Sequence, residues 1–170
     1  MKGKNKNAWE GPAAVQHPGG ISLLSRREIQ APIAACLIRE YAGVMGLKRA
    51  LEVASAAIQA DAVLMGRALA QRYGGYTMMD LARVVREVWT EDDALTLRIL
   101  EESAERLRFD VTRCRYVELY ERLGMKELGF CLSCTRDEVF TKGFNPRIRL
   151  ARTQTIMQGA PFCDFHFTLV

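Results

Sequence analysis

The sequence lacks the features that mark membrane-spanning or exported proteins. No run of apolar residues approaches the roughly 20 that span a bilayer. The N-terminal segment is basic at Lys2, Lys4 and Lys6, but polar residues, proline and glycine follow where an export signal has an apolar core. We therefore expect a cytoplasmic protein that does not associate with a membrane.

The sequence also lacks a basic stripe, internal repeats and low-complexity blocks. The net charge is only +4, and the arginines are interleaved with Glu and Asp, so we expect no nucleic-acid partner. A chain of 170 residues with 49% hydrophobic and 26% charged residues fits one globular domain with its own core.

Cysteines are few and odd in number, since the chain has five. In a chain without an export signal, this count indicates reduced thiols and excludes a disulfide framework as the basis of the fold. Histidine is scarcer still, with His17 near the N-terminus and His166 near the C-terminus.

Two regions are predicted along the chain. Residues 1–24 combine Lys, Asn, Gly and Pro and are expected to form a flexible arm, whereas residues 25–170 form a single domain. Ser25 and Glu28 have capping-box spacing and predict a helix start, and Pro32 leaves open whether the helix kinks or begins there. Apolar residues then recur at helical spacing and are expected to face the core: Ile29, Ile33, Cys36, Leu37 and Tyr41.

The remaining periodicity predicts helices first and strands later. The expected elements are a long helix over 46–73, a helix opened by Thr77, strands over 96–101 and 106–112, a helix ending at Gly124, a helix over 126–142, and two strands joined by a turn at 158–161. This order predicts an α+β fold. An N-terminal helical half would pack on an antiparallel sheet of about four strands, built from two hairpins with helices inserted between them.

The last strand carries chemistry as well as apolar residues. Strand alternation sends Cys163, Phe165 and Phe167 to one face and Asp164 and His166 to the other. Asp164 and His166 lie side by side, as a general base and the carboxylate that orients it would. A pair on an exposed sheet face is the simpler alternative.

Three cysteines are placed where they can converge. Cys114 follows a strand, Cys134 lies on the neighbouring helix, and Cys163 begins the final strand. Such a set can hold a metal ion or an iron–sulfur cluster with one open position, or can supply a nucleophilic thiolate. Inert buried thiols are the plain alternative. Cys131 and Cys134 form one C-x-x-C pair, without the second pair of a zinc knuckle, and a redox disulfide is a further hypothesis.

Polar residues near these cysteines are candidates for substrate binding. Arg113 and Arg152 suit bidentate recognition of a carboxylate, unless they pair with nearby acidic residues. Thr153 and Thr155 point to one side of their predicted strand, and Asn145 lies in the turn before it. We therefore expect a small-molecule substrate that carries a carboxylate.

Several segments of the second half carry a family resemblance. They are Thr-Arg-Cys-Arg-Tyr at 112–116, Leu-Ser-Cys-Thr-Arg-Asp at 132–137, Gly-Phe-Asn-Pro at 143–146, Arg-Thr-Gln-Thr at 152–155 and Cys-Asp-Phe at 163–165. In this order the chain resembles the L-2-amino-thiazoline-4-carboxylic acid hydrolase family over about Ser25 to Phe167. Cys114, Cys134 and Cys163 match the family pattern, whereas members often have arginine in place of His166.

The resemblance implies hydrolytic opening of a 2-aminothiazoline ring towards carbamoyl-cysteine and then cysteine. That reaction needs a nucleophile at the amidine carbon, a proton for the departing atom and a cation for the carboxylate. The hypothesis is a hydrolase of a cyclic amidine or thioimidate, with a three-cysteine site and Asp164 as a catalytic residue. The alternative is a non-enzymatic metal- or ligand-binding sensor that uses the same cysteines. A homo-oligomer formed through the alanine-rich helix stays open.

Overall fold

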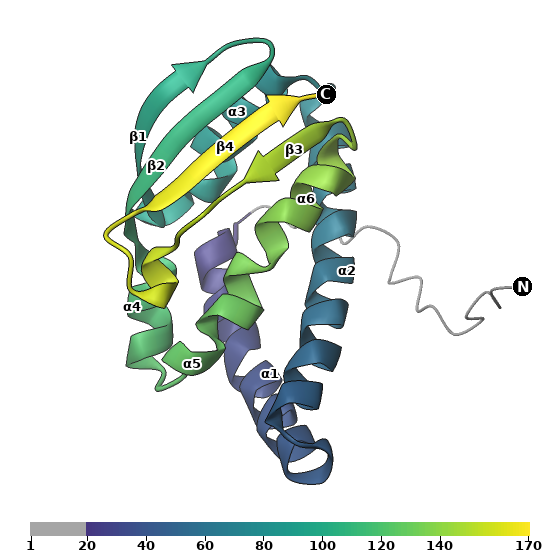
Figure 1. Cartoon of the computed structure of the whole chain (residues 1–170), viewed down its shortest axis with the longest axis vertical. Helices are drawn as coiled ribbons and strands as arrows, with labels where there is room; N and C mark the ends of the chain where they lie inside the picture. The colour runs from purple at the N-terminus through teal and green to yellow at the C-terminus, as the bar shows by residue number, and fades with distance from the viewer. Residues whose placement is uncertain (1–19) are drawn as a thin grey trace, which may run out of the picture.

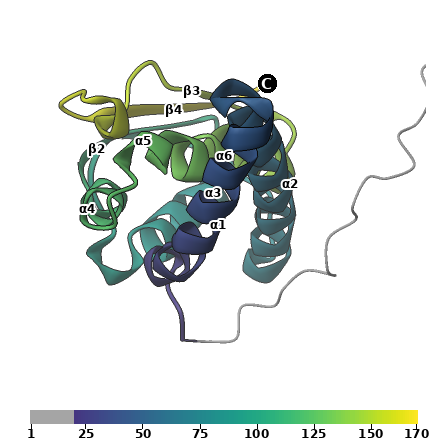
Figure 2. The same cartoon turned by 90° about the horizontal axis from the view of Figure 1, so that it is seen from below.

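The computed structural model describes residues 20–170 and shows a four-stranded antiparallel sheet with helices on one side (Figures 1 and 2). The sheet order is β1-β2-β4-β3. The strands are β1 (Leu95–Glu102), β2 (Arg106–Cys114), β3 (Ile148–Ala151) and β4 (Cys163–Leu169). The predicted α+β fold with about four strands in two hairpins is therefore confirmed. Of the predicted arm, residues 1–19 lie outside the described residues.

The helices surround the sheet in chain order. They are α1 (Leu23–Met45), α2 (Leu47–Tyr73), α3 (Met78–Val84), α4 (Arg115–Arg122), α5 (Lys126–Gly129) and α6 (Arg136–Phe144). Short turns complete the fold: π-turns η1 (Val85–Trp89) and η3 (Phe130–Cys134), and 3₁₀ turns η2 (Glu91–Asp93) and η4 (Ile156–Gln158). The capping box predicted at Thr77 is present.

The inner face of the sheet forms the main core. Phe165 and Phe167 on β4 are buried as strand alternation predicts, and Phe165 stacks on Phe109 with ring centroids 5.0 Å apart. Trp89 meets the rings of Phe140 and Phe165 edge-on, at 5.5 and 6.0 Å. Aromatic burial of this kind contributes about 1.5–3 kcal/mol for each ring. The packed rings hold η1 and α6 against the sheet.

Helix α1 buries a different face from the one predicted. Its N-cap is Ser22, whose Oγ accepts a hydrogen bond from the Ser25 amide at 3.2 Å, so Ser25 is not the cap. Pro32 lies within the helix without ending it. The buried residues of this helix are Leu24, Arg27, Ala31, Ala35 and Ile38. The predicted inward residues are exposed, Cys36 included, because the alanine face brings the backbone of α1 close to its neighbours.

Helices α2 and α6 touch through their backbones. A Cβ on Gly66 would lie 2.2 Å from the Phe140 carbonyl oxygen, and a Cβ on Gly143 would lie 2.2 Å from the Val63 carbonyl oxygen. No side chain larger than hydrogen fits at either position. This crossing sets the position of α6 and of the residues at its N-terminal end.

Within residues 20–170, α2 is long and apolar enough to cross a membrane by length and composition, with a mean hydropathy of 1.2 over its most apolar window. The expectation that no segment reaches that length was therefore wrong. Length and composition are weak evidence on their own, because the core helices of globular domains meet the same criteria. The C-terminal half of α2 packs into the core through Ala62, Leu69 and Ala70.

The helix predicted over 126–142 is interrupted. Five residues, Phe130–Cys134, form a π-turn between α5 and α6, and a second π-turn precedes β1 at Val85–Trp89. A π-turn inserts a residue into a helix and rotates the residues beyond it, and such turns are frequent at functional sites. The first strand of the second hairpin is also shorter than predicted, since β3 ends at Ala151 before Thr153 and Thr155.

Candidate functional site

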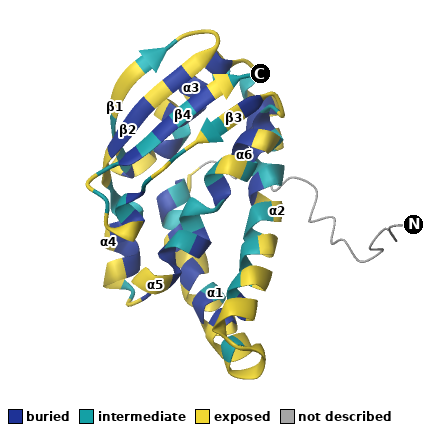
Figure 3. Ribbon diagram, in the orientation of Figure 1, coloured by how far each residue is buried: buried dark blue, intermediate teal, exposed yellow. Residues whose placement is uncertain are grey.

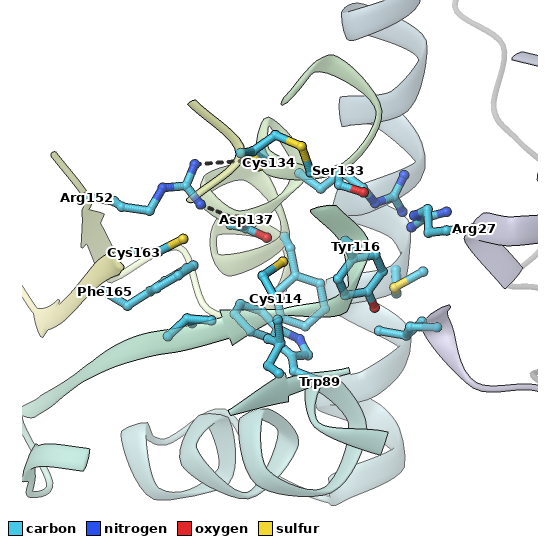
Figure 4. Close-up of a pocket in the computed structure, with 17 residues that line it drawn as sticks. Arg27, Trp89, Cys114, Tyr116, Ser133, Cys134, Asp137, Arg152, Cys163 and Phe165 are labelled. Atoms are coloured by element: carbon cyan, nitrogen blue, oxygen red, sulfur yellow. Dashed lines mark hydrogen bonds and ion pairs between the residues drawn. The ribbon is translucent and has the colours of Figure 1, made fainter. Parts of the chain in front are cut away.

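A cavity of about 100 Å³ lies between the inner face of the sheet and helices α1, α4 and α6 (Figure 4). On the measure of about 10–15 Å³ for one water, it has room for a small organic molecule. Its lining residues are Leu23, Arg27, Met65, Trp89, Leu95, Val111, Cys114, Tyr116, Ser133, Cys134, Arg136, Asp137, Phe140, Arg152, Met157, Cys163 and Phe165. Both π-turns contribute side chains, Trp89 from η1 and Ser133 and Cys134 from η3.

The structure brings Cys114, Cys134 and Cys163 to this one cavity. Cys114 ends β2 and occupies the N-cap position of α4, Cys134 ends η3, and Cys163 begins β4. Three segments that are distant in the sequence therefore meet, as expected from the ends of their elements. Whether the thiols carry chemistry stays a prediction.

All three thiols are held in the neutral form at neutral pH. Burial raises the pKa of Cys114 to about 11, although the backbone amides of Val117 and Tyr116 act in the opposite direction. Burial also raises the pKa of Cys134 and of Cys163. The sulfur of Cys163 accepts a hydrogen bond from the Ile156 amide at 3.2 Å. A thiolate in this cavity therefore needs a neighbouring base.

Asp137 and Arg152 form an ion pair beside the thiols. Arg152 donates one hydrogen bond to the Asp137 carboxylate and another to the Cys134 carbonyl at 3.0 Å, and its guanidinium lies 5.1 Å from the Phe165 ring centroid. Burial raises the pKa of Asp137, and Arg152 opposes that shift. The charge of Asp137 acts on all three thiols and raises the pKa of each. We name these five residues the thiol end: Cys114, Cys134, Asp137, Arg152 and Cys163.

Sequence reasoning treated Asp137 only as an ion-pair partner. A usable signal was present, because Cys134 and Asp137 are three residues apart and residues at that spacing share a helix face. Arg152 was proposed to bind a substrate carboxylate, and the structure places it in the cavity already paired with Asp137.

The opposite end of the cavity, which we name the arginine end, holds Arg27, Tyr116, Ser133 and Arg136. Arg136 donates to the Asp61 carboxylate at 2.5 Å and to the Ile58 carbonyl at 3.3 Å. Arg27 donates to the neutral Gln30 side chain at 2.7 Å, and no ion pair to it exists among residues 20–170. Sequence reasoning missed Arg27. The signal was a lone arginine in helical register with Ala31 and Ala35.

Other predicted site residues lie away from the cavity. The Asp164 carboxylate accepts hydrogen bonds from the Thr153 hydroxyl at 2.6 Å, the Thr153 amide at 3.0 Å and the Gln154 amide at 2.8 Å. Partial burial acts to raise its pKa, but these hydrogen bonds lower it overall. Asp164 thereby anchors the loop after β3. His166 is on the same outward face, opposite Arg108 and Ala151.

The remaining predicted binders have structural partners. Arg113 is exposed and forms a bidentate pair with Glu118, at 2.8 and 3.0 Å. The Thr155 hydroxyl bonds Gln158 within η4. Asn145 donates to the Tyr76 carbonyl at 2.6 Å. These residues are absent from the cavity lining, because the short β3 directs the following loop along the outside of the sheet.

Metal binding at the cysteines receives no support. Among residues 20–170, no three His, Cys, Asp or Glu side chains form a group that could hold a metal ion, so the thiols do not fit a metal ion or cluster. The C-x-x-C pair is also split by the π-turn. Cys131 faces α2, with its sulfur 3.1 Å from the Ser55 hydroxyl, whereas Cys134 faces the cavity. This arrangement disfavours the redox disulfide.

Comparisons with known proteins identify a fold relative and a family. No curated protein matches the chain. The structure is similar to that of a trafficking protein particle complex subunit 3 from Naegleria fowleri, described as covalently bound to palmitic acid, with a TM-score of 0.52 and 10% identity over 85% of this chain and 95% of that chain. Such a low identity shows a shared fold alone. The family model for L-2-amino-thiazoline-4-carboxylic acid hydrolase matches residues 26–167. The resemblance carried by the cysteine-bearing segments is therefore confirmed, and the chain belongs to the L-2-amino-thiazoline-4-carboxylic acid hydrolase family.

Proposed function

We propose that the protein is a hydrolase that opens the ring of a small cyclic amidine or thioimidate carboxylate. The observation that carries this proposal is the thiol end, where three thiols and a buried carboxylate–guanidinium pair meet in a cavity of small-molecule size. Family membership supports hydrolysis, and the description of the family supplies the substrate class.

Cys114 is the best-placed nucleophile. It occupies the N-cap position of α4, where the partial positive charge of the helix end and the amides of Tyr116 and Val117 favour a thiolate. Asp137 is the base, since its charge acts on this thiol and its pKa is raised by burial. Arg152 keeps the Asp137 carboxylate in place throughout.

The chemistry balances for a 2-aminothiazoline ring. Asp137 takes the proton of the Cys114 thiol as its sulfur bonds to the amidine carbon, and the proton then passes to the ring sulfur as the carbon–sulfur bond of the ring breaks. An isothiourea links Cys114 to the opened substrate. Water, deprotonated by Asp137, attacks the same carbon and forms the carbonyl of carbamoyl-cysteine. The Cys114 sulfur departs and recovers its proton from Asp137. The net change is the addition of one water.

The test is ring opening of 2-amino-thiazoline-4-carboxylate by single variants. Cys114→Ser is expected to lower kcat/KM by at least about a hundredfold, as the loss of a covalent nucleophile does. Cys134→Ser and Cys163→Ser should have smaller effects. The exposed Cys36 and the outward-facing Cys131 supply matched controls, Cys36→Ser and Cys131→Ser, which should keep wild-type activity. Full activity in all three cavity variants would refute the proposal.

A second candidate is a non-enzymatic domain that carries an acyl group on one of these thiols. Two observations favour it: the cavity floor is apolar, and the Naegleria fowleri protein of similar fold is described as covalently bound to palmitic acid. In such a domain, a cavity thiol would attack a long-chain acyl thioester and release its thiol. Intact-mass measurement after incubation with palmitoyl-coenzyme A tests this. A stoichiometric adduct lost in one cysteine variant, together with no ring opening, would support the carrier over the hydrolase.

A further inference from the structure

Arg27 is a buried cation without an acidic partner among residues 20–170. Only 8% of its surface is exposed, and its hydrogen-bond acceptor is the neutral amide oxygen of Gln30. The other two arginines of the cavity each pair with a carboxylate, Arg136 with Asp61 and Arg152 with Asp137. A buried charge that lacks a partner is costly, and a bound anion is the simplest source of the missing counter-charge.

The surroundings of Arg27 suit an anion. The charges of Arg136 and Arg27 act on one another, and Tyr116 also acts electrostatically on Arg27. The Tyr116 hydroxyl belongs to a mostly buried side chain and makes no hydrogen bond within the described part of the chain, so it is available as a donor. Burial, followed by the neighbouring Arg136, lowers the pKa of Arg27 to about 10, a shift that a bound anion would reverse.

We propose that Arg27, Tyr116 and Arg136 form the subsite that binds the carboxylate of the ligand. A planar guanidinium can donate two parallel hydrogen bonds to a carboxylate, and the phenol can donate a third. This assignment replaces the sequence-based choice of Arg113 and Arg152, which pair with Glu118 and Asp137.

The subsite also sets the orientation of the ligand. Tyr116 lies between Arg27 and Cys114 in the cavity (Figure 4). A small molecule whose carboxylate meets Arg27 therefore extends past Tyr116 and presents its other end to the thiols. The orientation rests on the proposed function, because it places the amidine carbon beside Cys114. Binding of the carboxylate itself does not depend on catalysis.

The test uses a ligand that cannot be hydrolysed. Thiazolidine-4-carboxylate has the ring and the carboxylate but no amidine carbon, and thiazolidine lacks the carboxylate. Binding is measured by isothermal titration calorimetry. The wild-type protein should bind the carboxylate at least about tenfold more tightly than thiazolidine, as expected for one charge-assisted contact. Arg27→Met should abolish this preference, and Arg113→Met is the matched control at an exposed, paired arginine.

The outcomes separate the subsite from the hydrolase. An unchanged carboxylate preference in Arg27→Met, or no preference in the wild type, overturns the subsite whether or not the protein opens rings. A preference that depends on Arg27 supports the subsite even if no ring opening is detected. Ligand-free Arg27→Met should have a Tm no lower than that of the wild type. A large loss of Tm would mean that Arg27 is structural and would also overturn the proposal.

A separate feature of α1 points to a partner. Five exposed apolar residues follow one face of the helix at spacings of three or four: Ile29, Ile33, Leu37, Tyr41 and Val44. Ile33 is 68% exposed and Val44 is 85% exposed. Figure 3 shows the exposed residues that gather on the α1–α2 hairpin. Continuous apolar stripes of this kind mark contact surfaces more often than they face water.

The charges at the two ends of α1 are complementary. The tip of the hairpin carries exposed Lys48 and Arg49, and the exposed acidic turn η2 packs beside the start of α1 through Ala94 and Leu24. An antiparallel second copy of α1 would place its basic tip beside this acidic turn, and the reverse contact would form by symmetry. A two-fold axis beside Ala35 also sets Ile33 opposite Leu37 of the second copy.

We infer that α1 forms an antiparallel, two-fold interface with a second copy of this chain. Cys36 lies next to the axis and is exposed, so it reports on the geometry. Sedimentation velocity of the full chain should give a dimer that Ile33→Glu converts to a monomer. Met79→Glu, at an exposed apolar residue of α3, is the control and should stay dimeric.

Mild oxidation with copper phenanthroline should produce a crosslinked dimer in the wild type and none in Cys36→Ser. Lys48→Glu with Arg49→Glu should weaken the dimer at least about tenfold, and Glu91→Lys with Asp93→Lys should restore it. A wild-type monomer at about 100 μM would overturn the inference, as would a dimer that survives Ile33→Glu. Binding of the monomer to phosphatidylcholine vesicles, lost in Ile33→Glu, would assign the stripe to a lipid surface instead.

Discussion

The two ends of the cavity treat buried charge in opposite ways. At the thiol end, Arg152 and Asp137 neutralise one another, and the thiols around them are neutral. At the arginine end, Arg27 has an amide as its partner and Arg136 as its neighbour. A compensated pair stabilises the free protein, whereas an uncompensated cation costs stability until an anion binds. The difference separates the part of the site that is built in advance from the part that a ligand completes.

The largest expected effect comes from breaking the compensated pair. Arg152→Met leaves the Asp137 carboxylate buried without its cation and should lower the free energy of unfolding by on the order of 3 kcal/mol at pH 7. Arg27→Met should have no such cost. Urea unfolding of both variants measures the contrast. Equal losses in the two variants would remove the distinction between the ends.

The neutral thiols predict a specific dependence of stability on pH. Because the pKa of Cys114 is about 11 in the folded protein and that of a free thiol is about 8.5, the unfolded chain loses its proton first. Cys114 therefore stabilises the fold fully below pH about 8.5, and this contribution is lost as pH rises through 11.

Between pH 8.5 and 11, wild-type stability should fall by roughly 2–3 kcal/mol more than that of Cys114→Ser. Urea unfolding under reducing conditions measures the two profiles, and Cys36→Ser should follow the wild type. Parallel profiles for wild type and Cys114→Ser would show that water reaches the Cys114 thiol more freely than its burial indicates.

A smaller effect is expected outside the cavity, at Asp164. Its hydrogen bonds from Thr153 and Gln154 favour the ionised form, so its contribution is present above pH about 4 and is lost as pH falls. Asp164→Asn should lower the free energy of unfolding by about 1–2 kcal/mol at pH 7 and change kcat/KM by less than about tenfold. Loss of ring opening at unchanged stability would restore Asp164 as a catalytic residue.

The smallest effect is expected at His166. It lies on the outward sheet face between Arg108 and Ala151, away from both ends of the cavity. His166→Ala should change the free energy of unfolding by less than about 0.5 kcal/mol and leave ring opening at the wild-type rate. A pH–rate profile that loses an ionisation in this variant would contradict the structural placement.

The fold was largely predictable from periodicity because strand alternation is a local signal. Phe165 and Phe167 had to share a face with Cys163, and two hairpins with inserted helices left few topologies to consider. Helix α1 shows the limit of the same signal. Its apolar and alanine stripes have the same period, and only the close approach of neighbouring helices selected Ala31 and Ala35 for the buried face.

The cavity was half predictable. The convergence of Cys114, Cys134 and Cys163 was expected from element ends and from the family pattern. Arg27 was not, because a charged residue on a helix is exposed in most proteins and its burial depends on distant residues such as Tyr116. The outward direction of Asp164 followed from alternation, but its use as an anchor for Thr153 depended on where β3 ends.

The π-turn at Phe130–Cys134 gives the segment before α6 a dependence on residue count rather than on residue type. Each residue of an α-helix advances the chain by about 100°, so deletion of one residue from this turn would restore a regular helix and swing α6 by about that angle. Asp137 would then leave the cavity, although every side chain of the site was still present. Single-residue deletions here should therefore be far less tolerated than conservative substitutions, and homologous chains are best aligned with the length of this segment held constant.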